Sequence, residues 1–323
     1  MTAPAPTAPT VPTGPPGEAE LSCYTTNLVA HLRSRLPDAA DRLAHAVRLA
    51  VRTDAPGTGL AFSHHRRVDR TADGRELGYR AAADWTAARA GIEDEAAREG
   101  RVLAVGNTRT LPWCPAHRKQ DAPHWVLLEP VPGDGPRWRV TDHFAALLPD
   151  GEQHPYSGLL DEDGLRAALT PIPRPAPEAR LRDAHALGTA VALPDPAHHR
   201  WLAWGPAAPE PRRAGEWLEE PLAVLEFLAG RLAADGETLA RNTDDLWAAA
   251  RHHRHRLHRL AGAGLLPRAP ALAAAASWSE LPRSLRFAAA SAERGRPRPG
   301  VVRKAFHDVI TTMARIPKED TSR

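Results

Sequence analysis

The sequence predicts an α+β protein, with an N-terminal domain built on an antiparallel sheet and a mainly helical C-terminal domain. Two strand-like runs flank a turn rich in Pro and Gly near residue 133, and long helical patterns dominate the last third of the chain. A length of 323 residues with 42% apolar residues allows two domains, each with its own core. We expect a disordered Pro-rich tail over 1–17, an N-terminal α+β domain over 18–172, and a helical domain over 173–323.

Local patterns predict the elements of the first half in order. Leu28, Val29, Leu32 and Leu36 recur at helical spacing, and Pro37 ends the helix that they define. We then expect a helix over 38–54, a strand in "GTGLAFSHH", a helix ended by Gly100, a strand in "RVLAVGNT", a loop in "TLPWCPAHRKQDAP", and two strands in "HWVLLEPV" and "PRWRVTDHF".

The second half begins at a Pro-rich boundary. "LLPDGEQHPYSGLLDEDGLRAAL" predicts a loop and a short helix before it, and "TPIPRPAPEARLRD" marks the boundary near residues 170 to 182. Beyond it, "AGEWLEEPLAVLEFLAGRLAADG", "ETLARNTDDLWAAARHHRHRLHRLAGAG" and two Ala-rich segments predict helices.

Composition narrows the classes of function. A formal charge of +3 is too small to indicate nucleic-acid binding, and no basic stretch is interleaved with aromatic residues. Two cysteines make no disulfide framework, so a reduced, cytoplasmic setting is expected. The first residues lack the pattern of a secretory signal, and no apolar run approaches the roughly 20 residues that span a bilayer. We therefore expect neither membrane nor nucleic acid as a partner.

The hairpin carries a candidate base and its orienting acid. A turn centred on Gly133 would place His124 directly opposite Asp142 on one face of the sheet. A carboxylate there can accept the imidazole N–H, set the tautomer and stabilise the imidazolium. The pairing depends on the register of the hairpin.

Cys23 is the candidate nucleophile. If a helix starts near Ser22, this thiol lies in its first turn, where the helix dipole favours the thiolate. A helix-borne cysteine facing a base on a sheet suits acyl transfer through a thioester. In isolation, Cys23 could equally be a small buried core residue.

Three segments together resemble a known family. "SCYTTNLVAHL", "HWVLLEPV" and "WRVTDHFAALLP" resemble the Cys, His and Asp segments of papain-like enzymes, and more narrowly of the BtrH-like acyltransferases of butirosin biosynthesis and related actinobacterial natural-product pathways. The resemblance covers roughly residues 20 to 170. It implies that residues 18–172 form a papain-like catalytic domain with Cys23, His124 and Asp142 as the catalytic residues, and that the helical domain over 173–323 completes the substrate cleft.

The resemblance also implies a reaction. An acyl, aminoacyl or peptidyl group would pass from an acyl or peptidyl carrier protein to Cys23 and then to a small-molecule amine or an internal nucleophile, without a resident cofactor or metal. Papain-like proteases often place a Gln before the Cys as an oxyanion donor, but this chain has none before Gln120. Asn27 and Tyr24 are the remaining candidates for an oxyanion or pocket role, beside the Cys23 N–H.

Other interpretations stay open. The same three residues could serve a thioesterase or peptidase, and a scaffold that binds carrier proteins without catalysis is also compatible. Cys114 competes as nucleophile, and Cys114, His117 and His124 have a spacing that a metal could use. His143 should point away from the site. His154 and Tyr156 could line a pocket, although a solvated loop is the simpler interpretation.

The string "RHHRHRLHRL" at 251–260 is the strongest cluster of basic residues. A solvated basic helix face is its simplest interpretation. The alternative is a docking surface for an acidic carrier protein, formed by Arg251, Arg254 and Arg256.

Overall fold

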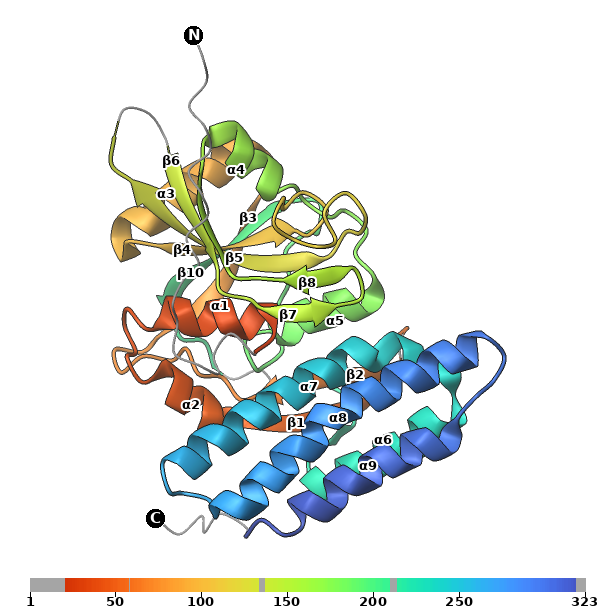
Figure 1. Ribbon diagram of the computed structural model, residues 1–323. Helices are drawn as coiled ribbons and strands as arrows, with labels where there is room; N and C mark the ends of the chain where they lie inside the picture. The colour runs from red at the N-terminus through yellow and green to blue at the C-terminus, as the bar shows by residue number, and fades with distance from the viewer. Residues whose placement is uncertain (1–20, 58, 134–136, 210–213, 318–323) are drawn as a thin grey trace. The chain divides into compact units, whose positions relative to one another are not determined.

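The computed structural model describes residues 21–57, 59–133, 137–209 and 214–317, and it confirms the α+β class (Figure 1). The chain divides into two compact units. In the described part, the first unit comprises 21–39, 69–179 and 191–209, and the second comprises 40–68, 180–190 and 214–317. The predicted tail over 1–17 lies outside the described residues.

The first unit is built on an antiparallel sheet of six strands. Their order across the sheet is β3 (Arg75–Ala82), β10 (His199–Pro206), β4 (Val102–Asn107), β5 (Pro123–Val131), β6 (Arg137–Asp142) and β9 (Tyr156–Leu160). A separate ladder joins β7 (Ala146–Leu148) to β8 (Gly151–Gln153). The hairpin that was expected to carry the base and the acid is formed by β5 and β6, which lie inside this sheet between β4 and β9.

Helices cover both faces of the six-stranded sheet (Figure 1). On one face, α1 (Cys23–Leu32) packs against β4 and β5, and Tyr24 contacts Trp125. On the other face, α3 (Trp85–Glu99) and α4 (Glu162–Ala168) bury Ile92 and Leu165 in a core shared with β4, β5, β6 and β10. Successive residues of a strand point to opposite faces, so each strand contributes to both layers.

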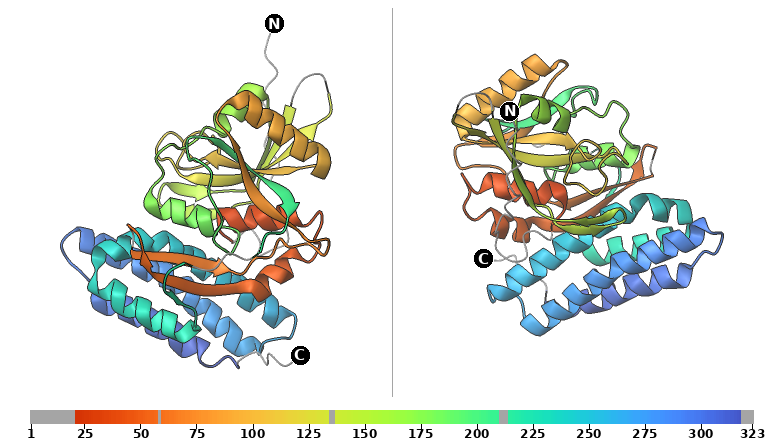
Figure 2. Two further views of the ribbon diagram at one scale, coloured as in Figure 1. Left: turned by 180° about the vertical axis from the view of Figure 1, so that it is seen from behind. Right: turned by 45° about the horizontal axis from the view of Figure 1, so that its top comes forward.

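The second unit pairs a small sheet with helices. Its strands run in the order β11 (Trp217–Leu218), β1 (Val47–Ala55) and β2 (Gly59–His65). Its helices are α2 (Ala39–Ala46), α6 (Pro221–Ala234), α7 (Gly236–Gly262), α8 (Arg268–Glu293) and α9 (Pro299–Met313), and α5 (Pro177–His185) begins in the first unit and ends in the second. Figure 2 shows β1 and β2 lying along α6 and α7. Trp278 and Phe306 are fully buried in the core that these elements share.

Three predictions about domains and elements were wrong. The units are discontinuous and do not divide at residue 172, because β10 from beyond that boundary inserts between β3 and β4, while β1 and β2 belong with the C-terminal helices. The predicted helix over 38–54 ends at Ala46 and continues as β1. Val47, Leu49 and Val51 alternate along β1, and this period of two prevails over the helical interpretation once β2 and β11 supply partners. Strands β7 to β9 replace the loop expected before α4.

Candidate functional site

Cys23 is the first residue of α1, as the sequence predicted. Ser22 caps the helix, because its side chain accepts a hydrogen bond from the backbone N–H of Thr25 at 3.4 Å. Cys23 is half-buried, whereas the rest of the helix from Thr25 onward is buried. The thiol therefore lies at the positive end of the helix dipole, and part of the residue stays accessible.

The register of the β5–β6 hairpin differs from the prediction by two residues. Leu127 pairs with Thr141 and Leu128 with Val140, so each partner lies two positions beyond the one that a turn centred on Gly133 would give. His124 is therefore not directly opposite Asp142. A shift of two preserves the sheet face, since side chains alternate with a period of two. The two side chains consequently approach each other diagonally.

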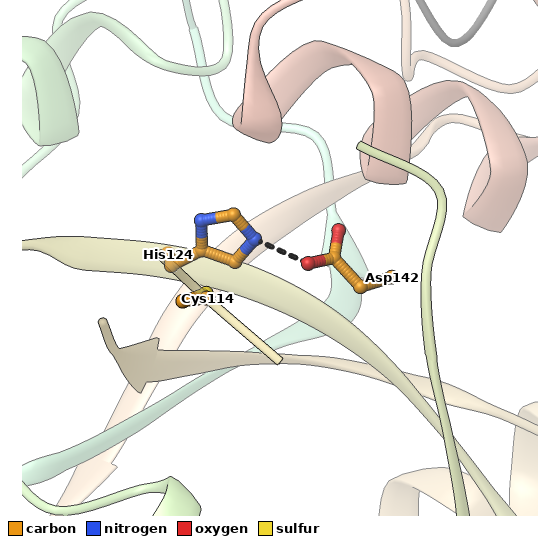
Figure 3. Close-up of side chains that lie close together, drawn as sticks. All are labelled: Cys114, His124 and Asp142. Atoms are coloured by element: carbon orange, nitrogen blue, oxygen red, sulfur yellow. Dashed lines mark hydrogen bonds and ion pairs between the residues drawn. The ribbon is translucent and has the colours of Figure 1, made fainter. Parts of the chain in front are cut away.

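His124 and Asp142 form a buried hydrogen-bonded pair (Figure 3). Their closest atoms, His124 Nε2 and Asp142 Oδ2, are 2.7 Å apart, and both residues are buried. With Nε2–H donating to the carboxylate, Nδ1 is the ring nitrogen that remains for a nucleophile. This confirms the predicted contact between the candidate base and its acid.

Five donors surround the carboxylate of Asp142 among the described residues. Oδ1 accepts from the side-chain amide of Asn27 and from the backbone N–H of Phe144, both at 3.0 Å. Oδ2 accepts from His124, from Trp113 Nε1 at 3.0 Å and from Gln153 Nε2 at 3.1 Å. A carboxylate has about four lone-pair positions, so these donors satisfy it completely. The sequence does not reveal Trp113 or Gln153 as partners of Asp142, because neither stands in a recognisable motif.

Asn27 joins the three elements of the site. Its Nδ2 donates to Cys23 O at 3.1 Å, to Trp125 O at 2.8 Å and to Asp142 Oδ1, and its Oδ1 accepts from the backbone N–H of His143 at 2.9 Å. One buried side chain thus connects α1, β5 and the end of β6. Both amide hydrogens are engaged in these contacts, which favours a positioning role for Asn27. The oxyanion role that was considered for it stays a prediction.

His124 and Asp142 each stabilise the charged form of the other. Burial opposes the imidazolium, but the Asp142 carboxylate raises the pKa of His124 well above its ordinary value, and Cys114 and Cys23 add to this effect when they are thiolates. Burial likewise opposes the charge of Asp142, yet His124 and the hydrogen bonds from Asn27 and Phe144 lower the pKa of this carboxyl. The arrangement favours an imidazolium beside a carboxylate. Cys23 is near enough for its charge to act on His124.

Cys114 also lies beside this pair (Figure 3). Its Sγ, a ring nitrogen of His124 and a carboxylate oxygen of Asp142 lie within 4.8 Å of one another. Burial raises the pKa of the Cys114 thiol to about 11, which leaves it protonated at neutral pH. Cys23 is not a member of this close group, although it is near enough for its charge to act on His124. Its greater exposure and its place at the start of α1 make it a better candidate nucleophile than Cys114.

A metal at Cys114, His124 and Asp142 does not fit the hydrogen bonding. Every lone-pair direction of Asp142 already has a donor, and His124 Nε2 is directed at the carboxylate itself. His117, which the spacing had suggested as a further ligand, does not join this group in the described part of the chain. The cluster is a hydrogen-bonded anion with its base, and not a set of open ligands.

The remaining predicted residues make other contacts. Tyr24 is half-buried and packs on Trp125, with ring centroids 5.0 Å apart, so it contributes to the contact between α1 and β5. Arg251, Arg254 and Arg256 are half-buried on α7, and Arg251 stacks over Trp247 at 4.6 Å. His252, His253 and His255 of the same helix are buried, so the interpretation of this string as a solvated face was wrong. Docking of a carrier protein there stays a prediction.

No model of a known protein family matches this chain, and a search of curated proteins finds no match. Across the residues that the structure describes, no helix combines the length and the apolar character needed to cross a membrane.

Proposed function

We propose that this protein is a cysteine-dependent acyltransferase with Cys23 as nucleophile, His124 as base and Asp142 as the acid that orients His124. The observation that carries the proposal is the buried 2.7 Å contact between His124 and Asp142, tied through Asn27 to the helix that begins at Cys23. A nucleophile, a base and an orienting group in this order are the parts that covalent acyl transfer requires.

The reaction proceeds in two half-reactions. His124 removes the proton of the Cys23 thiol, the thiolate attacks the thioester carbonyl, and the tetrahedral intermediate releases the donor thiol, which takes the proton from His124. An acceptor amine then attacks the Cys23 acyl group, gives its proton to His124, and displaces the Cys23 thiolate. The backbone N–H of Cys23, at the first position of α1, has no acceptor within the helix and is one donor for the oxyanion.

The donor that we propose is a phosphopantetheine thioester on an acyl or peptidyl carrier protein, and the acceptor is a small-molecule amine or a nucleophile within the chain being released. This substrate class rests on the resemblance of the Cys, His and Asp segments to BtrH-like acyltransferases. A reduced compartment such as the cytoplasm would keep Cys23 as a thiol. Arg251, Arg254 and Arg256 are the proposed docking residues for the acidic carrier.

Intact-mass measurement tests the proposal. The protein is mixed with carrier proteins loaded with acyl or aminoacyl groups, and with an N-acetylcysteamine thioester as a small donor. We expect a mass increase of one acyl group, located at Cys23 by peptide mapping. The variant Cys23→Ser should lose the thioester adduct, and Cys114→Ser should retain it because Cys114 is a protonated thiol.

The acceptor is tested by following the decay of the adduct. Decay that is accelerated by an added amine and yields an amide supports transfer, whereas amine-independent release of the free acid would identify a thioesterase. An adduct on Cys114, or none on the wild type with any donor, contradicts the proposal. Carrier binding that survives Cys23→Ala without any adduct in the wild type would identify a scaffold.

A further inference from the structure

An aromatic pair lies against the acid of the site and has no part in the two half-reactions. Trp113 belongs to the segment between β4 and β5, and Tyr156 begins β9. Their rings stack face to face, with centroids 4.1 Å apart and planes inclined by 3°. In the β6–β9 ladder, Tyr156 is the direct partner of Asp142. The stack is therefore anchored to the residue that orients the base.

Strand β9 leaves space for the Tyr156 ring because it has a glycine at position 158. A Cβ added at Gly158 would lie 2.1 Å from Tyr156 Oη, a distance that atoms cannot adopt without moving. Gly158 is two residues beyond Tyr156 and shares its sheet face. The tyrosine ring thus lies over a position without a side chain, and the indole of Trp113 rests on the tyrosine ring.

The indole N–H and the imidazole N–H converge on one atom. Trp113 Nε1 is 3.0 Å from Asp142 Oδ2, and His124 Nε2 is 2.7 Å from the same oxygen. Gln153 supplies a third donor to this oxygen. Because donors that share an oxygen restrict each other's directions, rotation of the carboxylate would break the bond to Trp113 together with the bond to His124.

We propose that Trp113 is a positioning residue for the base: its N–H holds the Asp142 oxygen that orients His124, and the stack with Tyr156 holds the indole. The inference rests on the proposed function, in which His124 activates Cys23. The ionisable groups that face His124 are Asp142 at the end of β6, Cys114 from the segment before β5, and Cys23 from α1. Trp113 acts on this group only through Asp142.

Trp113→Phe tests the inference, because phenylalanine keeps a ring to stack on Tyr156 and removes the N–H. Trp85→Phe is the matched control. Trp85 also donates its indole N–H to a carboxylate in the first unit, that of Glu162 at 3.3 Å, and the contacts that the structure describes for Trp85 include neither Asp142 nor His124. Both variants lose the same atoms and one hydrogen bond of the same kind.

Two measurements are made on both variants. The first is the rate of acyl-adduct formation at Cys23, which we expect Trp113→Phe to lower about tenfold, as for loss of one hydrogen bond to a charged group. The second is the low-field proton resonance of His124 Nε2–H, assigned by its absence in His124→Gln. We expect this resonance to shift or broaden in Trp113→Phe and to stay in place in Trp85→Phe.

The outcomes separate this inference from the proposed function. An unmoved resonance with an unchanged rate in a folded Trp113→Phe overturns the positioning role, whatever the activity of the wild type. A moved resonance, without adduct formation even in the wild type, supports the hydrogen-bond role and contradicts acyl transfer. If Trp113→Phe does not fold, Tyr156→Leu removes the stack alone; a smaller displacement of the same resonance supports the inference, and no displacement overturns it.

Discussion

Asn27 Nδ2 donates a hydrogen bond to Asp142 Oδ1 at 3.0 Å, and this contact joins residues 115 positions apart in the chain. The same amide binds Trp125 O, next to His124, and Cys23 O, one turn earlier in α1. The start of α1, the strand of His124 and the carboxylate of Asp142 are therefore held by one side chain. The contribution of these hydrogen bonds to stability can be measured without a substrate.

Replacing Asn27 by Ala should destabilise the first unit. The change leaves buried carbonyls of Cys23 and Trp125 and the N–H of His143 without this partner, and we expect the free energy of unfolding to fall by roughly 3 kcal/mol. Urea unfolding at pH 7 measures the change. Asn242→Ala is the control: this buried Asn binds only Thr238 O of its own helix in the contacts that the structure describes, so its loss should cost about 1 kcal/mol. Equal losses in the two variants would contradict a joining role for Asn27.

Replacing Asp142 by Asn should lower the pKa of His124. In the wild type, burial opposes the imidazolium and the carboxylate outweighs it; without the carboxylate, burial prevails. NMR titration of the His124 ring protons measures the shift, and His258→Gln, on an exposed residue of α7, helps to assign the spectrum. A His124 pKa that stays above its ordinary value in Asp142→Asn would show that another group supports the charge.

The same pair predicts how stability depends on pH. Because the folded pKa of His124 lies above the unfolded value of about 6.5, its contribution is complete below pH 6.5 and is lost as pH rises through the folded pKa. The loss amounts to at most about 1.4 kcal/mol per pH unit. Urea unfolding from pH 6.5 upward should therefore show a steeper decline for the wild type than for Asp142→Asn. Parallel curves would contradict the pair as a source of stability.

Alkylation should distinguish the two cysteines. With a pKa of about 11, roughly one Cys114 thiol in a thousand is ionised at pH 8, and burial restricts access to it. We expect iodoacetamide to modify Cys23 in the native protein and to reach Cys114 only after unfolding, as peptide mapping by mass spectrometry would show. If native Cys114 is modified faster than Cys23, Cys114 becomes the better candidate for the nucleophile.

Acid should weaken the second unit through its buried histidines. Burial lowers the pKa of His253 to about 3 and those of His65 and His185 to about 4. Since these values lie below the unfolded value, the stability from the neutral rings is present above pH 6.5 and is lost as pH falls toward 4. Thermal unfolding between pH 7 and 4.5 should show this decline.

His253 allows the most direct test of that decline. Its ring stacks on Trp278 at 4.2 Å, and neither ring nitrogen has a hydrogen-bond partner among the described residues. His253→Phe keeps the stack and removes the group that must stay neutral, so it should raise stability at pH 5 by about 1–2 kcal/mol. His258→Phe makes the same change at an exposed position of the same helix and is the matched control. If His253→Phe brings no gain in stability at pH 5, the buried ring of His253 is not a cause of the decline in acid.

Gly91 should tolerate no side chain. A Cβ at this position of α3 would lie 2.3 Å from Cζ2 of Trp201 in β10, so Gly91→Ala should destabilise the first unit by about 1–3 kcal/mol. Gly230 of α6 has nothing within 4 Å of its added Cβ, and Gly230→Ala should stabilise its helix by up to about 1 kcal/mol. Thermal unfolding of both variants checks the two predicted changes in stability. Equal shifts in the same direction would show that the contact with Trp201 does not govern the packing of α3.

Local signals in the sequence predicted the fold class and many of the elements. Ser22 before Cys23, and Gly100 after a helical pattern, predicted a helix start and a helix end that the structure confirms. The two strands of the hairpin were predicted from their apolar runs and the intervening turn. The helix expected over 38–54 was wrong in its second half, because strand partners distant in the chain decided between two compatible periods.

By itself, the sequence determined where the candidate nucleophile, base and acid stand on their own elements, since capping residues and apolar periods act over a few neighbours. Only the tertiary structure decided that Leu127 pairs with Thr141, so that His124 meets Asp142 diagonally. It also decided that Trp113 and Gln153 complete the carboxylate's hydrogen bonds. The physical reason is that a buried charge must be satisfied by whatever donors the fold brings within reach, and those donors come from segments that no local pattern connects.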